Sequence, residues 1–480
     1  MSLNLEYNVR CKTGCLEKSN WSFDQIKEFS ADNSSGFCAY KLYDYRKFCN
    51  LSFEEAKDII STFEHPVESK KCNDVLMTHY LFPYTYKHQI DELCARETHV
   101  MPVINVIAEF FGLSATLVLG DIYGRKPVII YSQLVYIVCN LIRRFPIEPI
   151  TWYLIIFLAK ASMTSAINAS LILFLEAIHF EERPLGITLI SLGTSLGCVF
   201  KGLFYRFDKS WEFYQELINC FLVVPLFSQW LLWESPHWLL CNLRWVELED
   251  LLKQIDRRGH ADLSDEIEEK LSETKTSAKI IFSTLKKPIF RNRIFCNMIL
   301  YSISSFLYSM QINHVLYESK CENMLYFMIS ITLIATIVII PRVLPTFSRP
   351  MSMCLTFLVI ALQHTAATIY NLDESWKYFA ICLSVLTTEM TIMLNELLIV
   401  EKFPTKVRVT SMNLCKICAV IFVSFTNGAC RITHLESNIK NYEDFIYLIM
   451  ALIGACVCLF IKATNINMLP DTEVEAILDL

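Results

Sequence analysis

The chain has 480 residues, of which 53% are hydrophobic and only 19% are charged. Soluble domains carry about 25% charged residues, so this composition excludes an ordinary soluble enzyme and a disordered chain. The formal net charge of −6 gives no support for a nucleic-acid partner. Residues 1–99 and 241–292 are polar, so the rest must be more apolar than the average. Together these features predict a membrane protein with two soluble segments.

The apolar stretches predict eleven membrane-spanning helices, since each span needs about 20 mostly apolar residues. The first is MPVINVIAEFFGLSATLVLG, which starts near residue 100. The others are expected at about 128–147, 151–176, 184–206, 211–233, 294–316, 324–345, 351–371, 376–400, 409–430 and 443–462. Helices are expected because a β-barrel would need shorter strands of alternating polarity. The predicted fold class is therefore an all-α polytopic membrane protein.

These spans divide the chain into five parts. We expect a segment before the first span (1–99), a bundle of five spans (100–233), a central loop (234–292), a bundle of six spans (293–463) and a tail (464–480). Lys and Arg are balanced between the short loops on the two sides, and the middle loop 241–292 adds ten more to the side that holds Arg125. The positive-inside rule then places the central loop and the carboxyl end in the cytoplasm and the amino end outside.

The amino-terminal segment is rich in cysteine and in glycosylation sequons. Its cysteines are an even set of six: Cys11, Cys15, Cys38, Cys49, Cys72 and Cys94. Its sequons begin at Asn20, Asn33 and Asn50. An oxidised, glycosylated, extracellular segment is the preferred interpretation, and six cysteines allow fifteen pairings. The alternative is a reduced cytoplasmic segment in a chain that is simply rich in cysteine. No signal peptide is recognisable in MSLNLEYNVRCKTGC, so we expect that something normally precedes residue 1.

Three loop motifs narrow the family. The turn after the first span reads GDIYGRK, with Asp121, Gly124, Arg125 and Lys126 in a pattern that resembles G-x-x-x-D-R-x-G-R-K. The fifth span is followed by ESPHWL, with Glu234, Ser235, Pro236 and Trp238, which resembles E-S-P-R-W-L. A third motif, EKFPTKVR, contains Glu401, Pro404, Thr405 and Arg408 and resembles E-x-[FY]-P-T-x-x-R.

Together these motifs resemble the major facilitator superfamily. A large cysteine-bearing segment separates the organic cation and anion transporters (solute carrier family 22) from the sugar porters, so the chain resembles the former. The resemblance implies a fold of two helix bundles, in which the eleven predicted spans correspond to family helices 2–12 and the first family helix is lacking. It also implies that the loop contacts hold the two halves together in one conformation and release them in the other.

The resemblance places several polar residues of the spans in a central substrate cavity. The residues concerned are Lys160, Gln311, Glu389 and Lys416. An ionisable residue inside a span is a functional hypothesis by default, although a structural ion pair is the alternative. In the family, a helix-11 position twelve residues after the motif Arg indicates the charge of the substrate, and here that position is Val420. Lys416 lies one turn earlier and would favour an anion or a zwitterion.

The leading hypothesis is a secondary transporter of small organic ions in the plasma membrane, working by alternating access. A cation, an anion and a carnitine-like zwitterion all remain open as substrates. We expect no enzyme activity, no cofactor and no metal site. The loop after the eighth family helix, PRVLPTFSRPMSM, has lost the Asp and the Gly-Arg pair of the signature. A transport-impaired relative that acts as a surface receptor or interaction protein is therefore the alternative, and a sugar-porter-like facilitator is a third.

Overall fold

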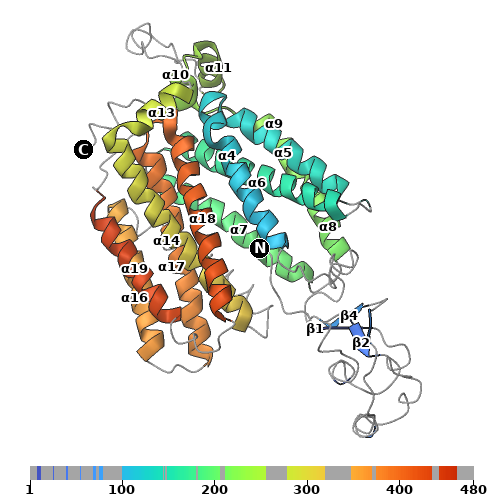
Figure 1. Cartoon of the computed structure of the whole chain (residues 1–480). Coiled ribbons are helices and arrows are strands. Elements are labelled where there is room, and N and C mark those ends of the chain that lie inside the picture. Colours follow the sequence, from blue (N-terminus) through green and yellow to red (C-terminus); the bar gives the residue numbers. More distant parts are fainter. Residues whose placement is uncertain are drawn as a thin grey trace. The chain divides into compact units, whose positions relative to one another are not determined.

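The computed structural model describes most of the chain after residue 100 (Figure 1). The described ranges are 100–143, 149–179, 182–205, 211–255, 278–318, 348–369, 374–434 and 443–461, with a few short segments and single residues elsewhere. The chain divides into two compact units. One unit comprises Met1–Val103 with Phe204–Cys220, and the other comprises Ile104–Leu203 with Phe221–Leu480. They are described separately.

The first unit contains four short strands that the sequence pattern did not predict. β1 (Asn8–Cys11) pairs antiparallel with β4 (Val75–Thr78), and β2 (Ala39–Lys41) pairs antiparallel with β3 (Ser69–Lys71). Of the six cysteines only Cys11 is described, through its backbone in β1. The other five cysteines and the three sequon asparagines lie outside the described residues. Disulfides and glycosylation therefore stay predictions.

The second unit is helical, which confirms the predicted fold class. Its first helices are α4 (Val100–Ile122), α5 (Arg125–Ile142), α6 (Pro149–Ala177), α7 (Arg183–Tyr205) and α9 (Val223–Leu231). The central loop contributes α10 (Pro236–Cys241), α11 (Trp245–Ile255) and α13 (Ala278–Lys286). The later helices are α14 (Pro288–Glu318), α16 (Arg349–Ile369), α17 (Glu374–Lys402), α18 (Arg408–His434) and α19 (Glu443–Leu459).

Four of the described helices are long and apolar enough to cross a membrane. They are Val103–Ile122, Ile150–Ala177, Leu383–Lys402 and Thr405–Thr426. Large apolar side chains such as Ile150, Leu362 and Phe425 point outward and are more than half exposed, which is typical of a surface that meets lipid rather than water. The expected span at 324–345 lies outside the described residues, so the count of eleven stays a prediction.

The predicted fifth span, 211–233, is divided into two helices. α8 (Trp211–Phe221) ends at Phe221, and α9 begins at Val223 after a turn at Leu222. Pro225 explains the interruption, because its nitrogen carries no hydrogen to donate to the Phe221 carbonyl four residues earlier. The prediction of one continuous helix was wrong at this point.

The core of the helical unit is formed mainly by the later helices. α16 packs against α19, and α14 packs against α17 and α18, while α5 packs against α6 (Figure 1). One apolar cluster runs through α14, α16, α17, α18 and α19 and reaches α6 at Leu171, Ile172 and Leu175. α4 also approaches α6 closely, because a Cβ at Gly112 would lie 2.3 Å from the Ala161 carbonyl oxygen. Such small-residue contacts are typical of helices that pack in membranes.

Candidate functional site

The turn between α4 and α5 is built around Gly124. Its φ is +107°, and a Cβ placed there would lie 2.3 Å from the Glu234 carboxylate. That carboxylate caps α5, because it accepts hydrogen bonds from the backbone N–H groups of Arg125 (3.0 Å) and Lys126 (3.1 Å). A negative charge at a helix N-terminus is favourable. Burial nevertheless raises the pKa of Glu234 above its ordinary value. Glycine is thus required here both by the turn and by the cap.

We expect Gly124→Ala to destabilise the protein by more than about 1 kcal/mol, since alanine is strained at positive φ and would displace the Glu234 cap. The measurement is the thermal midpoint of the purified protein. The matched control is Gly193→Ala, because a Cβ at Gly193 would meet nothing within 4 Å. Equal midpoints for the two variants would contradict the role assigned to Gly124.

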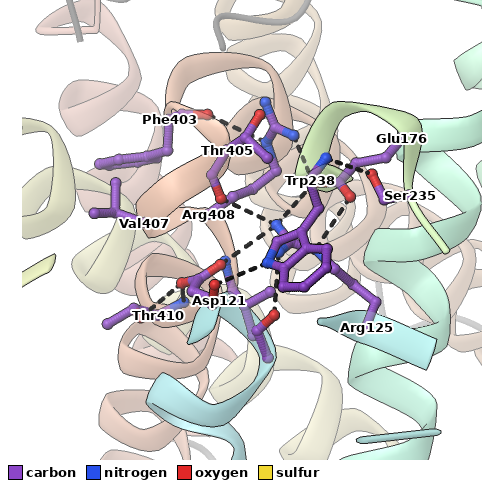
Figure 2. Close-up of polar contacts among 12 residues, drawn as sticks. Asp121, Arg125, Glu176, Ser235, Trp238, Phe403, Thr405, Val407, Arg408 and Thr410 are labelled. Atoms are coloured by element: carbon purple, nitrogen blue, oxygen red, sulfur yellow. Dashed lines mark hydrogen bonds and ion pairs between the residues drawn. The ribbon is translucent and has the colours of Figure 1, made fainter. Parts of the chain in front are cut away.

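Arg125, Glu176 and Arg408 form a buried ionic centre, and we call it the Arg–Glu–Arg centre (Figure 2). Arg125 binds both oxygens of Glu176, at 3.1 and 3.0 Å, and Arg408 binds one of them at 2.6 Å. None of the three side chains is exposed to solvent. Arg125 also donates to the Thr405 carbonyl oxygen at 3.0 Å. The centre therefore joins α5 and α6 to the segment that links α17 and α18.

Asp121 makes a second connection between the early and the late helices. Its carboxylate accepts hydrogen bonds from the backbone N–H of Thr410 (2.9 Å) and from the Thr410 hydroxyl (2.8 Å), and it lies 3.3 Å from Arg125 (Figure 2). Thr410 is in the first turn of α18. Asp121 therefore satisfies N–H groups that helix geometry leaves without partners.

The second motif places Trp238 against these contacts. Ser235 caps α10 by accepting a hydrogen bond from the Trp238 backbone N–H, and Pro236 occupies the first turn. The Trp238 indole is buried and donates to the Asp121 carbonyl oxygen at 2.8 Å. The three loop motifs therefore meet at one end of the helical unit, and we call this end the motif end.

The loop PRVLPTFSRPMSM, which lacks the signature Asp and Gly-Arg pair, contains Arg349, and this arginine forms an ion pair. Arg349 pairs with Glu401, with 3.4 Å between the Arg349 Nε and a carboxylate oxygen. Arg349 begins α16 and Glu401 lies near the end of α17, just as Arg125 begins α5 and Glu176 lies near the end of α6. The second loop thus keeps an arginine–glutamate pair of the same kind, although the Asp and Gly-Arg signature is lost.

A row of polar residues on α18 continues the interface toward the middle of the unit. It consists of Arg408, Thr410, Asn413 and Lys416, and we call it the α18 ladder. Asn413 donates to the Thr116 hydroxyl on α4 at 3.1 Å, and Lys416 donates to the Asn168 amide oxygen on α6 at 2.5 Å. The row spans about 12 Å along the helix at 1.5 Å per residue. Each member bonds to α4 or α6, so α18 is held to the early helices over two turns.

Two ion pairs lie among the predicted cavity residues. Lys416 pairs with Glu396 at 2.7 Å, and Glu396 also accepts a hydrogen bond from the Tyr301 hydroxyl at 3.1 Å. Lys160 pairs loosely with Glu109 at 3.9 Å, and both of these side chains are about one third exposed. Both lysines thus have acidic partners, and Lys416 is the more strongly held of the two.

The remaining predicted cavity residues have different surroundings. Gln311 is buried and bonds to Ser384 and Thr388 on α17, within the late helices. Glu389 is half-buried on α17. Val420 is half-buried on α18, and its carbonyl oxygen accepts a hydrogen bond from Ser424. The structure therefore connects Lys416 to the early helices and places Gln311 in a separate polar cluster.

Sequence reasoning missed Glu176 and Glu396. Both glutamates lie within predicted apolar spans, so the rule for ionisable residues in membranes could have identified them. In the described part of the chain, no group of three or more His, Cys, Asp or Glu side chains is placed to hold a metal ion. The arrangement thus offers ion pairs and hydrogen bonds between helices.

Comparison with known proteins agrees with this architecture. Residues 87–425 match the family model described as the Major Facilitator Superfamily. The human steroid transmembrane transporter SLC22A24 is 26% identical over 176 residues, which are 37% of this chain and 30% of that protein. Mouse solute carrier family 22 member 22 is 25% identical over 279 residues, which are 55% of this chain and 49% of that protein. The matched segments thus span less than half of either relative.

A solved structure shows the same fold. The proton:xylose symporter XylE from E. coli, bound to a bromodeoxyglucose, aligns with a TM-score of 0.61 at 14% identity. The alignment covers 77% of this chain and 86% of the symporter. Proteins of the major facilitator superfamily are transporters and not enzymes. The chain is therefore an integral membrane protein that belongs to the major facilitator superfamily and resembles its organic cation and anion transporters.

Proposed function

We propose that the protein is a secondary transporter that moves small organic ions across the membrane by alternating access. The observation that carries this proposal is the polar interface at the motif end, where the Arg–Glu–Arg centre and the α18 ladder join α4, α5 and α6 to α18. Polar contacts of this kind exchange with water at modest net free energy, whereas a continuous apolar interface would stay closed. The interface is thus suited to open and close.

In this proposal the structure is the state in which the motif end is closed. Opening would break the contacts of Asp121 and Arg408 with the opposite helices, and the substrate would be released toward that side. Gradients of ions or of substrate would supply the energy, since the sequence contains no GxxxxGK[ST] loop for a nucleotide. The substrate would bind near the middle of the membrane, between the two halves, as is usual for this architecture.

The orientation belongs to the same proposal. The motif end would face the cytoplasm with the central loop 234–292 and the tail 464–480, and residues 1–99 would face the outside of the plasma membrane as a disulfide-bonded, glycosylated segment. The bundles would be 100–233 and 293–463. These assignments rest on the distribution of Lys and Arg and on the cysteines and sequons of the amino-terminal segment.

The test is uptake of labelled organic cations, organic anions and carnitine-like zwitterions into oocytes that express the full chain. We expect at least one compound to enter several-fold faster than into control oocytes, with the protein at the cell surface as measured by surface biotinylation. If the protein reaches the surface and no compound of any charge enters above control, the transporter proposal is wrong. Binding of a ligand without uptake would then favour a receptor.

A further inference from the structure

The short helix α13 directly precedes α14 and turns a basic and aromatic side outward (Figure 1). Its opposite side is buried at Ile281 and Thr284, and Ile281 belongs to the apolar cluster of the late helices. Lys279, Phe282 and Lys286 are exposed. These three positions are three and four residues apart, so they lie on one side of the helix. α13 is thus anchored on one side and presents two lysines and a phenylalanine on the other.

The first turns of α14 expose the same types of residue. Arg291 and Phe295 are both exposed, Phe295 to 63%, and their spacing of four residues places them on one side of α14. The predicted membrane span begins near residue 294, and Arg291 lies about 4.5 Å before it at 1.5 Å per residue. The headgroup layer on each side of a bilayer is about 5–7 Å thick. Arg291 therefore falls at the depth of the headgroups, and Phe295 falls at the edge of the acyl chains.

We call Lys279, Phe282, Lys286, Arg291 and Phe295 the basic face. The sequence contains no Asp or Glu between residues 274 and 317. Within the described part of the chain, the three cations of the basic face are in no ion pair. The exposed side of α11 differs, because there Lys253 pairs with Glu249 and Arg244 pairs with Glu247. The charges of α11 are thus met within that helix or beside it, whereas those of the basic face are directed outward.

We propose that the basic face binds the headgroups of anionic phospholipids. Ammonium and guanidinium groups pair with phosphate, and exposed phenylalanines beside them are typical of helices that lie in a membrane surface. An acidic protein would match the cations, but Phe295 falls within the bilayer, where a lipid is the available partner. In the orientation proposed above, the lipids would be those of the cytoplasmic leaflet, which is negatively charged. The inference does not rest on transport, because lipid binding is measured without a substrate.

The test measures lipid binding to the purified full chain in neutral detergent by native mass spectrometry. The probes are dioleoyl phosphatidylserine and dioleoyl phosphatidylcholine, which share their acyl chains and differ in the net charge of the headgroup. We expect phosphatidylserine to bind at least tenfold more tightly, since each basic residue near an anionic surface strengthens binding about fivefold. Equal affinities for the two lipids would overturn the inference.

Substitutions locate the binding. The triple variant Lys279→Gln, Lys286→Gln, Arg291→Gln should lose at least tenfold in affinity for phosphatidylserine and bind phosphatidylcholine as the wild type does. Lys286→Gln alone should lose about threefold to fivefold. The matched control is Lys253→Gln, which also removes an exposed lysine from the last turn of a helix, but one that pairs with Glu249. It should stay within about twofold of the wild type. An unchanged affinity in the triple variant would overturn the inference, and the single variant decides if the triple variant does not fold.

Other occupants of the basic face would give other results. Loss of the phosphatidylserine preference in millimolar inorganic phosphate would indicate a site for free anions. A polyglutamate peptide that binds the wild type but not the triple variant, without any lipid preference, would indicate an acidic protein partner. The acidic residues of 262–273 lie outside the described residues, and a lipid preference that appears only after their replacement by Asn and Gln would assign the face to that stretch. Each of these results overturns the inference, whereas a lack of organic-ion uptake would overturn only the transporter proposal.

Discussion

Replacing Glu176 by glutamine is expected to destabilise the protein more than any other single charge removal at the motif end. The Glu176 carboxylate binds two guanidinium groups, Arg125 and Arg408, and all three side chains are fully buried. Glutamine keeps the size of the side chain but leaves two positive charges without their shared partner. Removing one partner of a buried ion pair costs about 3–5 kcal/mol. A loss of this size is expected in the free energy of unfolding.

The measurement is the unfolding midpoint of the purified protein in detergent. The matched control is Glu247→Gln on α11, which removes a carboxylate that pairs with Arg244 at 3.2 Å on an exposed surface. Exposed pairs contribute less than about 1 kcal/mol, so this variant should unfold close to the wild type. Similar midpoints for the two variants would show that the Arg–Glu–Arg centre is not a major source of stability.

Glu176→Gln should also shift the protein toward the state in which the motif end is open. Thr116 is buried between α4 and α18, where its hydroxyl accepts a hydrogen bond from Asn413. A cysteine placed there by Thr116→Cys should react slowly with a water-soluble maleimide in the closed state. Adding Glu176→Gln should raise the labelling rate at least tenfold, since about 1.4 kcal/mol changes a two-state ratio tenfold. Unchanged labelling would mean that the centre stabilises the fold without controlling access.

The sequence predicted the parts of the site that depend on local structure. Gly124 is required by the backbone of one turn, and Ser235 caps the helix that it precedes, so both are recognisable from a few neighbouring residues. The helix boundaries were also predicted to within a few residues for most described spans, because apolar length sets them. The interruption at Leu222 departs from that rule because a single proline decides it.

The partners of the charged residues were not predictable in the same way. Glu176 meets Arg408 across 232 positions of sequence, and Lys416 meets Asn168 across 248. The net charge that a site presents depends on such pairings and not on the residue type at one position. Lys416 alone favours an anion or a zwitterion, but the Lys416 charge is neutralised where it pairs with Glu396. The residue type at one sequence position therefore does not give the net charge of its surroundings.

The Lys416–Glu396 pair is expected to behave as a coupled unit. Its side chains are each 13% exposed, and its members contact Asn168 and Tyr301 respectively. Lys416→Met leaves the Glu396 charge without its cation, and Glu396→Gln leaves the Lys416 charge without its anion. Each single variant should lose about 2–4 kcal/mol, somewhat less than a fully buried pair because some solvent reaches it. The double variant removes both charges and should be more stable than the sum of the two losses predicts.

The measurement is a double-mutant cycle on the free energy of unfolding, in which we expect a coupling energy of about 1–3 kcal/mol. Lys160 and Glu109 provide the control cycle, because their atoms lie 3.9 Å apart and both side chains are about one third exposed. The coupling of that pair should stay below about 1 kcal/mol. Additive losses at Lys416 and Glu396 would mean that the two residues do not neutralise each other. In that case the charge of Lys416 would be available to an anionic substrate.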